Sequence, residues 1–338
     1  MRPVHFIALA LPLLTGCLAE PMFVDEVVSV TENITLDSDV LKTRYVVTTA
    51  GVVIDGSGYT INGRCNTDCI GLSIAADNVT VRNVTVTGFD GGVSISRAAS
   101  GVTFENVNVV DNVQHGIYVD ANASNFTCRE CNLSDNGAMG IYLEYNTHGN
   151  VIENSVISNN GYRDKDTGDW IENLKNSKKD KREGLAIDAS QSNVIRNTDF
   201  HGNALAAITL YRNCGERGFR REWGASYNTI QGGNFSDDIL VAARQDRDLS
   251  EWDCQEPYVL NNKFITDDAE FNVIDGVTLE GNARIIIRDD NNIVTGVTGG
   301  RLIAHSNVRE TLEQPLIGLG IDFIDSQYVG DSSFVTGQ

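Results

Sequence analysis

Short runs of alternating apolar and polar residues recur along the middle of the chain at a nearly constant interval. Each run opens with a small residue, and apolar residues then occupy every second position, as in Gly116-Ile117-Tyr118-Val119-Asp120. The five runs begin at Gly92, Gly116, Gly140, Gly184 and Ala207, at separations of 24, 24, 44 and 23 residues. The interval of 44 is interpreted as one repeat with an insertion of about 20 residues. Such alternation predicts β-strands that bury one face.

Each repeat contains two more strand-like segments, joined by Asn- and Gly-rich turns. One begins at Asn78, Gly101, Asn150 and Asn193, and another follows it, as in residues 155–158. Three short strands in about 24 residues are typical of a parallel β-helix, whose coils stack because a single coil cannot bury its apolar face. Asparagines in the turns are expected to form amide ladders from coil to coil. An antiparallel β-sandwich is the alternative, but it does not explain why one phase persists through so many repeats.

The repeats, together with Val53–Gly63, resemble the right-handed β-helix proteins of the pectate-lyase-like superfamily, over roughly residues 45–300. The resemblance implies an all-β, single-domain, right-handed parallel β-helix with capped ends. It also implies a carbohydrate-active protein: a lyase, a hydrolase or a uronate epimerase. The chain lacks the Asp-Pro-His motif of alginate epimerases and the Gly-His-Gly motif of polygalacturonases. The chemistry must therefore be inferred from the site and not from the fold.

The first residues are typical of an export signal, with Arg2 followed by the apolar stretch Phe6–Leu14. The sequence Leu14-Thr15-Gly16-Cys17 resembles the lipobox of bacterial lipoproteins, which implies lipidation of Cys17 and a membrane anchor, with the outer membrane as the expected location. An ordinary cleaved signal is the alternative. The expected division of the chain is a signal peptide at 1–16, a linker and cap at 17–44, the β-helix at 45–306 with insertions near 161–182 and 212–223, and a cap at 307–338.

Six cysteines remain besides Cys17, an even number that fits disulfides in an oxidising compartment. The expected pairs are Cys65 with Cys69, Cys128 with Cys131, and Cys214 with Cys254. Zinc bound by Cys128 and Cys131 is the alternative, but the sequence offers no second ligand pair nearby.

The composition narrows the choice of partner. A net charge of −20 argues against nucleic acid, and 41% hydrophobic residues exclude a disordered chain. Yet 11 of the 26 basic residues fall in the insertions 161–182 and 212–223, each with a local charge of +2. We interpret the insertions as the walls of a cleft for an anionic polysaccharide, on a monomeric protein. The alternative is that they are solvated loops without a function.

The outward positions of the repeated strands form two columns. One column contains Ser94, Tyr118, Tyr142, Ala186 and Thr209, and the other contains Ser96, Asp120, Glu144, Asp188 and Tyr211. Adjacent rungs lie about 4.8 Å apart, so three carboxylates would be stacked. At least one of them should have a raised pKa unless a cation lies between them.

Three functions are compatible with these columns. The preferred hypothesis is β-elimination from a uronic-acid polymer, with Tyr142, Tyr118 or His115 as base or acid and with Arg212, Arg182 or a bound Ca²⁺ to neutralise the sugar carboxylate. Glu144 and Asp188 complete the catalytic candidates. Epimerisation begins with the same proton abstraction. The candidate substrate contacts are Tyr211, Arg182, Lys181, Arg220, Arg221 and Asp120.

The second hypothesis is a glycoside hydrolase that uses the carboxylates Asp120, Glu144 and Asp188. These three residues, with Glu183, are also the candidate ligands of a possible calcium ion; no other cofactor is expected. The third hypothesis is a surface lipoprotein that binds polysaccharide without catalysis.

Overall fold

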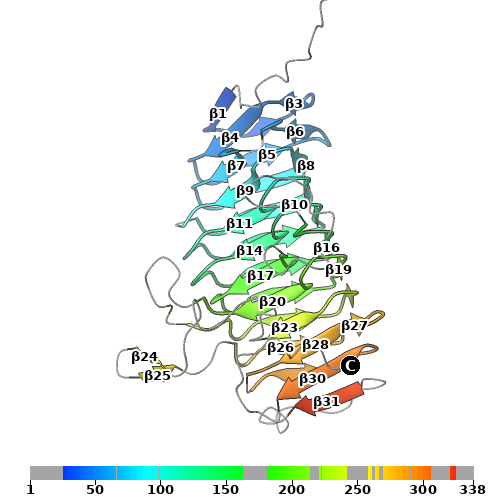
Figure 1. The fold of residues 1–338 in the computed structure, drawn as a ribbon. Helices are drawn as coiled ribbons and strands as arrows, with labels where there is room; N and C mark the ends of the chain where they lie inside the picture. Colours follow the sequence, from blue (N-terminus) through cyan, green and yellow to red (C-terminus); the bar gives the residue numbers. More distant parts are fainter. Residues whose placement is uncertain are drawn as a thin grey trace, which may run out of the picture.

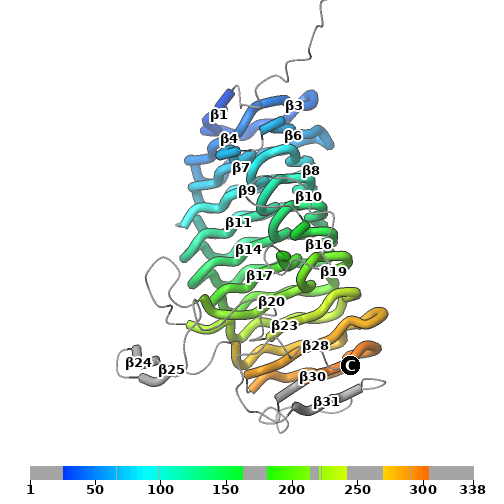
Figure 2. The backbone as a smooth tube through the Cα atoms, viewed as in Figure 1, coloured from blue at the N-terminus to red at the C-terminus, as the bar shows by residue number. Residues whose placement is uncertain are grey.

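The computed structural model describes residues 26–65, 67–97, 99–162, 181–213, 221, 223–241, 258–260, 263–265, 269–289, 291–305 and 320–324. They form an all-β parallel β-helix, whose coils follow one another along the molecule (Figure 1). The tube in Figure 2 shows the coils stacked in chain order from the N-terminal end. Within the described residues, no helix has the length and apolarity needed to cross a bilayer.

One face of the β-helix is a twelve-stranded parallel sheet, here called sheet A. Figure 1 shows its strands stacked one after another along the molecule. In spatial order they are β1 (Glu26–Val30), β4 (Thr43–Val47), β7 (Ile70–Ile74), β9 (Gly91–Ile95), β11 (Ile117–Val119), β14 (Ile141–Leu143), β17 (Leu185–Asp188), β20 (Ile208–Tyr211), β23 (Ile239–Val241), β28 (Arg284–Ile287), β30 (Arg301–His305) and β31 (Gly320–Ile324).

Two further ladders of parallel strands close the coils, and the long strands β8 (Thr80–Thr87) and β10 (Thr103–Val110) belong to both. The second face also contains β2 (Ile34–Thr35), β5 (Val53–Asp55), β12 (Thr127–Arg129), β15 (Val151–Glu153), β18 (Val194–Arg196), β21 (Thr229–Gln231), β26 (Val273–Asp275) and β29 (Ile293–Thr295). The third contains β3 (Val40–Leu41), β6 (Thr60–Asn62), β13 (Asn132–Ser134), β16 (Val156–Ser158), β19 (Asp199–His201), β22 (Asn234–Phe235) and β27 (Thr278–Leu279). A separate antiparallel hairpin pairs β24 (Tyr258–Leu260) with β25 (Lys263–Ile265).

The alternation in the repeated runs sets which side chains enter the core. The predicted inward positions are completely buried, and full burial of each large aliphatic side chain stabilises the fold by about 1.5–3 kcal/mol. They are Ile117, Val119, Ile141, Leu143, Leu185, Ile187, Ile208 and Leu210. Because strand register is parallel and in phase, each of these residues stacks on its equivalent in the next coil.

Small residues and asparagines shape the corners of the coils. A Cβ atom on Gly116 would lie 2.5 Å from the carbonyl oxygen of Gly140, so this corner requires glycine. The predicted amide ladders are present at two corners, where each Nδ2 donates to the Oδ1 of the next coil. The ladders contain Asn112, Asn136, Asn160 and Asn203 at one corner, and Asn150, Asn193, Asn228, Asn272 and Asn292 at the other.

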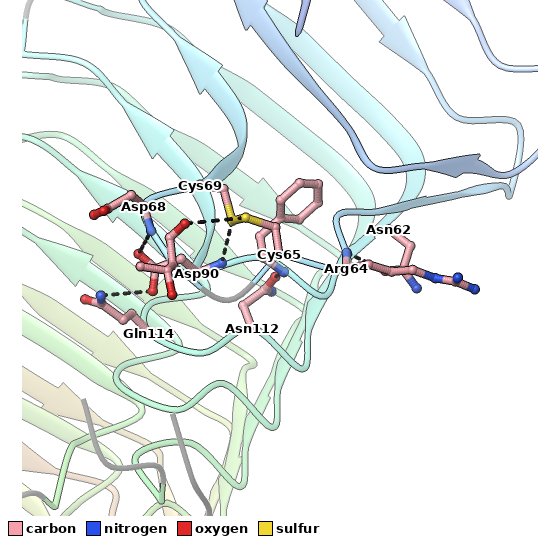
Figure 3. Close-up of a disulfide and its surroundings, with 10 residues drawn as sticks. Asn62, Arg64, Cys65, Asp68, Cys69, Asp90, Asn112 and Gln114 are labelled. Atoms are coloured by element: carbon pink, nitrogen blue, oxygen red, sulfur yellow. Dashed lines mark hydrogen bonds between the residues drawn. A yellow bond between two sulfur atoms is a disulfide. The ribbon is translucent and has the colours of Figure 1, made fainter. Parts of the chain in front are cut away.

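Two of the three predicted disulfides are present, Cys65–Cys69 and Cys128–Cys131. The second of these bonds means that Cys128 and Cys131 are not zinc ligands. Figure 3 shows the first bond beside Asp90, whose backbone N–H donates to Sγ of Cys69 and whose carboxylate accepts from Asp68 and Gln114. Burial raises the pKa of this carboxyl. Cys214 and Cys254 lie outside the described residues.

The parallel ladders extend beyond the expected limits of 45 and 306. Strand β1 already pairs with β4, and β31 pairs with β30. Residues 26–44 therefore supply the first rung, although they lack the small-residue run by which the repeats are recognised. Strand pairing therefore does not stop where the sequence repeat fades.

Candidate active site

The outward columns predicted from the repeat lie on the exterior of sheet A in the predicted register. Tyr118 pairs with Tyr142, Tyr142 with Ala186 and Ala186 with Thr209. In the neighbouring column Asp188 pairs with Tyr211. Parallel pairing without slippage thus brings together side chains that are 23 to 44 residues apart in sequence.

A guanidinium lies between two of the stacked acids. Nη2 of Arg221 lies 2.6 Å from Oε1 of Glu144, and its Nη1 contacts Oδ2 of Asp188. Arg221 is 1% exposed, Glu144 3% and Asp188 0%. The face of the Tyr145 ring also lies near this guanidinium, 5.8 Å from its carbon. Arg221 belongs to the insertion 212–223, so this insertion contributes a side chain to the acidic column.

Asp188 is the centre of this buried network. The hydroxyl of Tyr142 donates to its Oδ2 at 2.6 Å. Asn213 donates its backbone N–H to Oδ1 at 2.9 Å and its side-chain amide to Oδ2 at 2.7 Å. Burial and the charge of Asp188 raise the pKa of Tyr142 well above its ordinary value, so this phenol stays protonated. Tyr142 and Asp188 therefore form a fixed, water-excluded pair.

The pKa of Glu144 is raised, first by burial and then by the charge of Asp188, while Arg221 opposes the shift. The sequence predicted either a raised pKa or an intervening cation, and the column has both. The backbone N–H of Tyr145 donates to Oε1 of Glu144 at 3.0 Å, and the hydroxyl of Tyr118 donates to Oε2 at 2.9 Å. Tyr118 is only partly buried. It thus connects the buried network to the surface.

His115 and the two tyrosines form an aromatic cluster. Ring centroids lie 5.5 Å apart for His115 and Tyr118, 6.2 Å for His115 and Tyr142, and 5.4 Å for the two tyrosines. Burial of the imidazole, aided by the positive charge of Arg182, lowers the pKa of His115 to about 4. His115 is consequently neutral at pH 7. Arg182 and Lys181 are partly exposed and precede β17, and the positive charge of Arg182 acts on His115.

Of the other predicted site residues, Tyr211 packs in one cluster with Tyr142 and Tyr118. Asp120 is partly exposed, with Oδ1 on the N–H of Ala121 and Oδ2 3.7 Å from Nε of Arg97. Glu183, Tyr211 and Arg212 are buried. Glu183 precedes β17, whereas Asp188 ends it, so the two acids lie at opposite ends of one strand.

Some predictions concern residues outside the described part of the chain. They are Cys17, Arg220, most of the insertions 161–182 and 212–223, and most of the expected cap 307–338. The sequence did not predict one contact of this network: Asn213 donates two hydrogen bonds to Asp188. Its position immediately after two candidate residues, at the start of an insertion, was the available signal.

The carboxylates of Glu144 and Asp188 do not fit a calcium ion between them. Arg221 fills that place, and both oxygens of Asp188 already accept hydrogen bonds. In the described part of the chain, no three His, Cys, Asp or Glu side chains gather closely enough to hold a metal ion.

Comparisons with known proteins agree with this fold. Residues 32–178 match the family described as right handed beta helix region. Alginate lyase from Paenibacillus sp. str. FPU-7 superposes with a TM-score of 0.50 and 12% identity, over 88% of this chain and 97% of that one. No curated protein matches the chain by sequence.

Two A-modules of Azotobacter vinelandii mannuronan C-5 epimerases are also similar in structure. AlgE6 gives a TM-score of 0.48 at 14% identity, over 89% of this chain and 81% of the module; AlgE4 gives 0.48 at 14%, over 88% and 80%. The fold is a parallel β-helix, and residues 32–178 match the right handed beta helix region. At these identities the comparisons show the fold, and the activity must be argued from the site.

Proposed function

We propose that this protein is a polysaccharide lyase that cleaves a uronic-acid polymer by β-elimination on the outer face of sheet A. The observation that carries the proposal is the position of Tyr118, His115 and Arg182. They are the partly exposed members of the cluster, and Tyr118 is hydrogen-bonded to the buried Glu144–Arg221–Asp188 network. Tyr118 is therefore a partly exposed proton donor that is held by groups which substrate cannot reach.

The reaction divides among these residues as follows. Arg182 pairs with the sugar carboxylate and makes the C5 proton more acidic. Neutral His115 accepts that proton, the C4–oxygen bond breaks as a C4–C5 double bond forms, and the Tyr118 hydroxyl protonates the leaving oxygen. The buried carboxyls hold Tyr118 in position and do not react. A supporting fact is that the low pKa of His115 leaves its ring unprotonated at neutral pH.

The same geometry speaks against the hydrolase hypothesis. A retaining hydrolase needs two accessible carboxyls about 5–5.5 Å apart with the sugar between them. Glu144 and Asp188 are buried, and Arg221 occupies the space between them. A sugar ring could reach them only if this ion cluster broke apart.

The test is incubation of the purified protein with alginate, pectate and glucuronan. The ultraviolet absorbance of an unsaturated uronate should rise with at least one of them. Deuterium uptake at C5 without chain cleavage would identify a C5-epimerase. New reducing ends without that absorbance would identify a hydrolase, and binding without any product a non-catalytic protein; all three would overturn the lyase proposal.

We also propose that the protein is held on the cell envelope, in the outer membrane, through a lipid on Cys17. The lipobox-like sequence and the disulfides support an extracytoplasmic location. Expressed in a bacterial host, the wild-type protein should fractionate with outer membranes, and Cys17→Ser should become soluble. A membrane-bound Cys17→Ser variant would contradict the anchor.

A further inference from the structure

Two exposed aromatic side chains, Tyr227 and Phe271, lie on adjacent coils at the corner that leads into the second face. Their rings are stacked, with centroids 5.1 Å apart and planes inclined by 7°. Tyr227 is 56% exposed and Phe271 43%. Each ring therefore keeps much of its apolar surface in water, although the β-helix has a continuous core.

The backbone at both residues is unusual for an aromatic residue. Tyr227 has φ 60° and Phe271 φ 57°, in the left-handed region that disfavours bulky L-residues. On neighbouring coils the same left-handed position carries small or amide-bearing residues, namely Gly101, Asn125, Gly149, Ser192 and Asn291. A corner that glycine or asparagine fills without strain thus carries two aromatic rings. Strain kept at exposed residues is a reason to look for a function there.

The surroundings of the pair are polar and carry a negative charge. Ser192 and Asn291 are exposed on the coils on either side. The amide of Asn291 donates to Oε1 of Glu270, which directly precedes Phe271. Two rings with a polar border are far smaller than a protein interface, which buries roughly 800 Å² on each partner. They match instead a pyranose ring, which has an apolar C–H face and a rim of hydroxyls.

We propose that Tyr227 and Phe271 form a second carbohydrate-binding site that takes neutral pyranose units by stacking. The carboxylate of Glu270 would repel a uronate, so the site favours uncharged sugars. This inference does not rest on the proposed lyase activity, because none of its residues belongs to the Tyr118 cluster.

Affinity electrophoresis of the purified protein in gels that contain mixed-linkage β-glucan, xylan, galactomannan or alginate tests the inference. The double variant Tyr227→Asn/Phe271→Asn keeps the corner foldable, because asparagine already occupies this position in other coils. At least one neutral polymer should retard the wild-type protein, and the double variant should bind it about tenfold more weakly or worse. The Tm of the double variant should be unchanged or higher, because the strain is relieved.

Tyr59→Asn, an exposed tyrosine in the turn between β5 and β6, is the matched control and should bind normally. The inference is overturned if no neutral polymer retards the wild-type protein, if the double variant binds equally well, or if its Tm falls because the rings serve the fold. Release of unsaturated uronate, measured in parallel, reports on the Tyr118 cluster, so failure of the two proposals can be told apart.

Discussion

The guanidinium of Arg221 binds the carboxylate of Glu144 at 2.6 Å, with side chains that are 1% and 4% exposed. The same group contacts Asp188 on the adjacent rung. A β-helix stacks equivalent side chains, so acids in consecutive coils repel one another unless a cation intervenes. Here one arginine from an insertion pairs with two acids and fixes the residues that hold Tyr118 and Tyr142.

Removing this arginine should cost more stability than removing a surface partner. Arg221→Ala leaves two buried carboxyls without their cation, and the free energy of unfolding should fall by about 3–5 kcal/mol. The control is Arg82→Ala, because Arg82 is 46% exposed in its pair with Asp55 and should contribute within about 1 kcal/mol. Urea denaturation measures both variants. Equal losses in the free energy of unfolding would show that the buried ion pair stabilises the fold no more than the exposed one.

The asparagine ladder makes a second stability prediction. Oδ1 of Asn193 accepts from the backbone N–H and the side-chain amide of Asn150, and both residues are buried. Asn193→Ala would leave these two donors unsatisfied, which should cost about 3 kcal/mol. Asn108→Ala, at a partly exposed bond to Thr85, should cost less than about 1 kcal/mol. If thermal unfolding shows comparable stability losses for the two variants, the buried ladder contributes no more to stability than the partly exposed bond.

Acid should weaken the fold through His115. Its pKa is about 4 in the folded protein against 6.5 for an ordinary histidine, so the unfolded chain binds the proton more tightly. This contribution to stability is complete above pH 6.5 and is lost as the pH falls from 6.5 to about 4. His115→Gln should therefore lose less stability than wild type between pH 7 and about pH 4.5. His148→Gln, at an exposed histidine, should behave like wild type, and an unchanged pH response in His115→Gln would refute the assignment.

Much of the fold follows from the sequence because the repeat is itself a physical constraint. Ile117 and Val119 alternate with polar neighbours, Gly116 leaves room for the next coil, and the period of 24 sets which residues stack. The ends were harder to predict. Strand β1 has the alternation but not the small-residue signature, and its pairing with β4 depends on the finished coil and not on the repeat.

The site was predictable only where it belongs to the repeat. The column of Tyr118 and Tyr142 follows directly from strand register. The role of Arg221 does not follow from strand register, because a loop outside the repeat is positioned by its contacts with the whole fold. The sequence favoured it as a substrate contact, whereas the structure buries it between two acids. The left-handed backbone at Tyr227 could likewise not be predicted from the sequence, because that conformation is normally adopted by glycine or asparagine.

The most direct test of the central claim compares Tyr118→Phe with Tyr59→Phe on the polyuronate that the wild-type protein cleaves best. Removal of the Tyr118 hydroxyl should lower the rate of unsaturated-uronate release by about a hundredfold or more and leave Tm nearly unchanged, because Tyr118 lies at the edge of the buried network. Tyr59→Phe should retain the full rate. A Tyr118→Phe protein that releases product at the wild-type rate, or a wild-type protein that releases none from any polyuronate, would contradict the account.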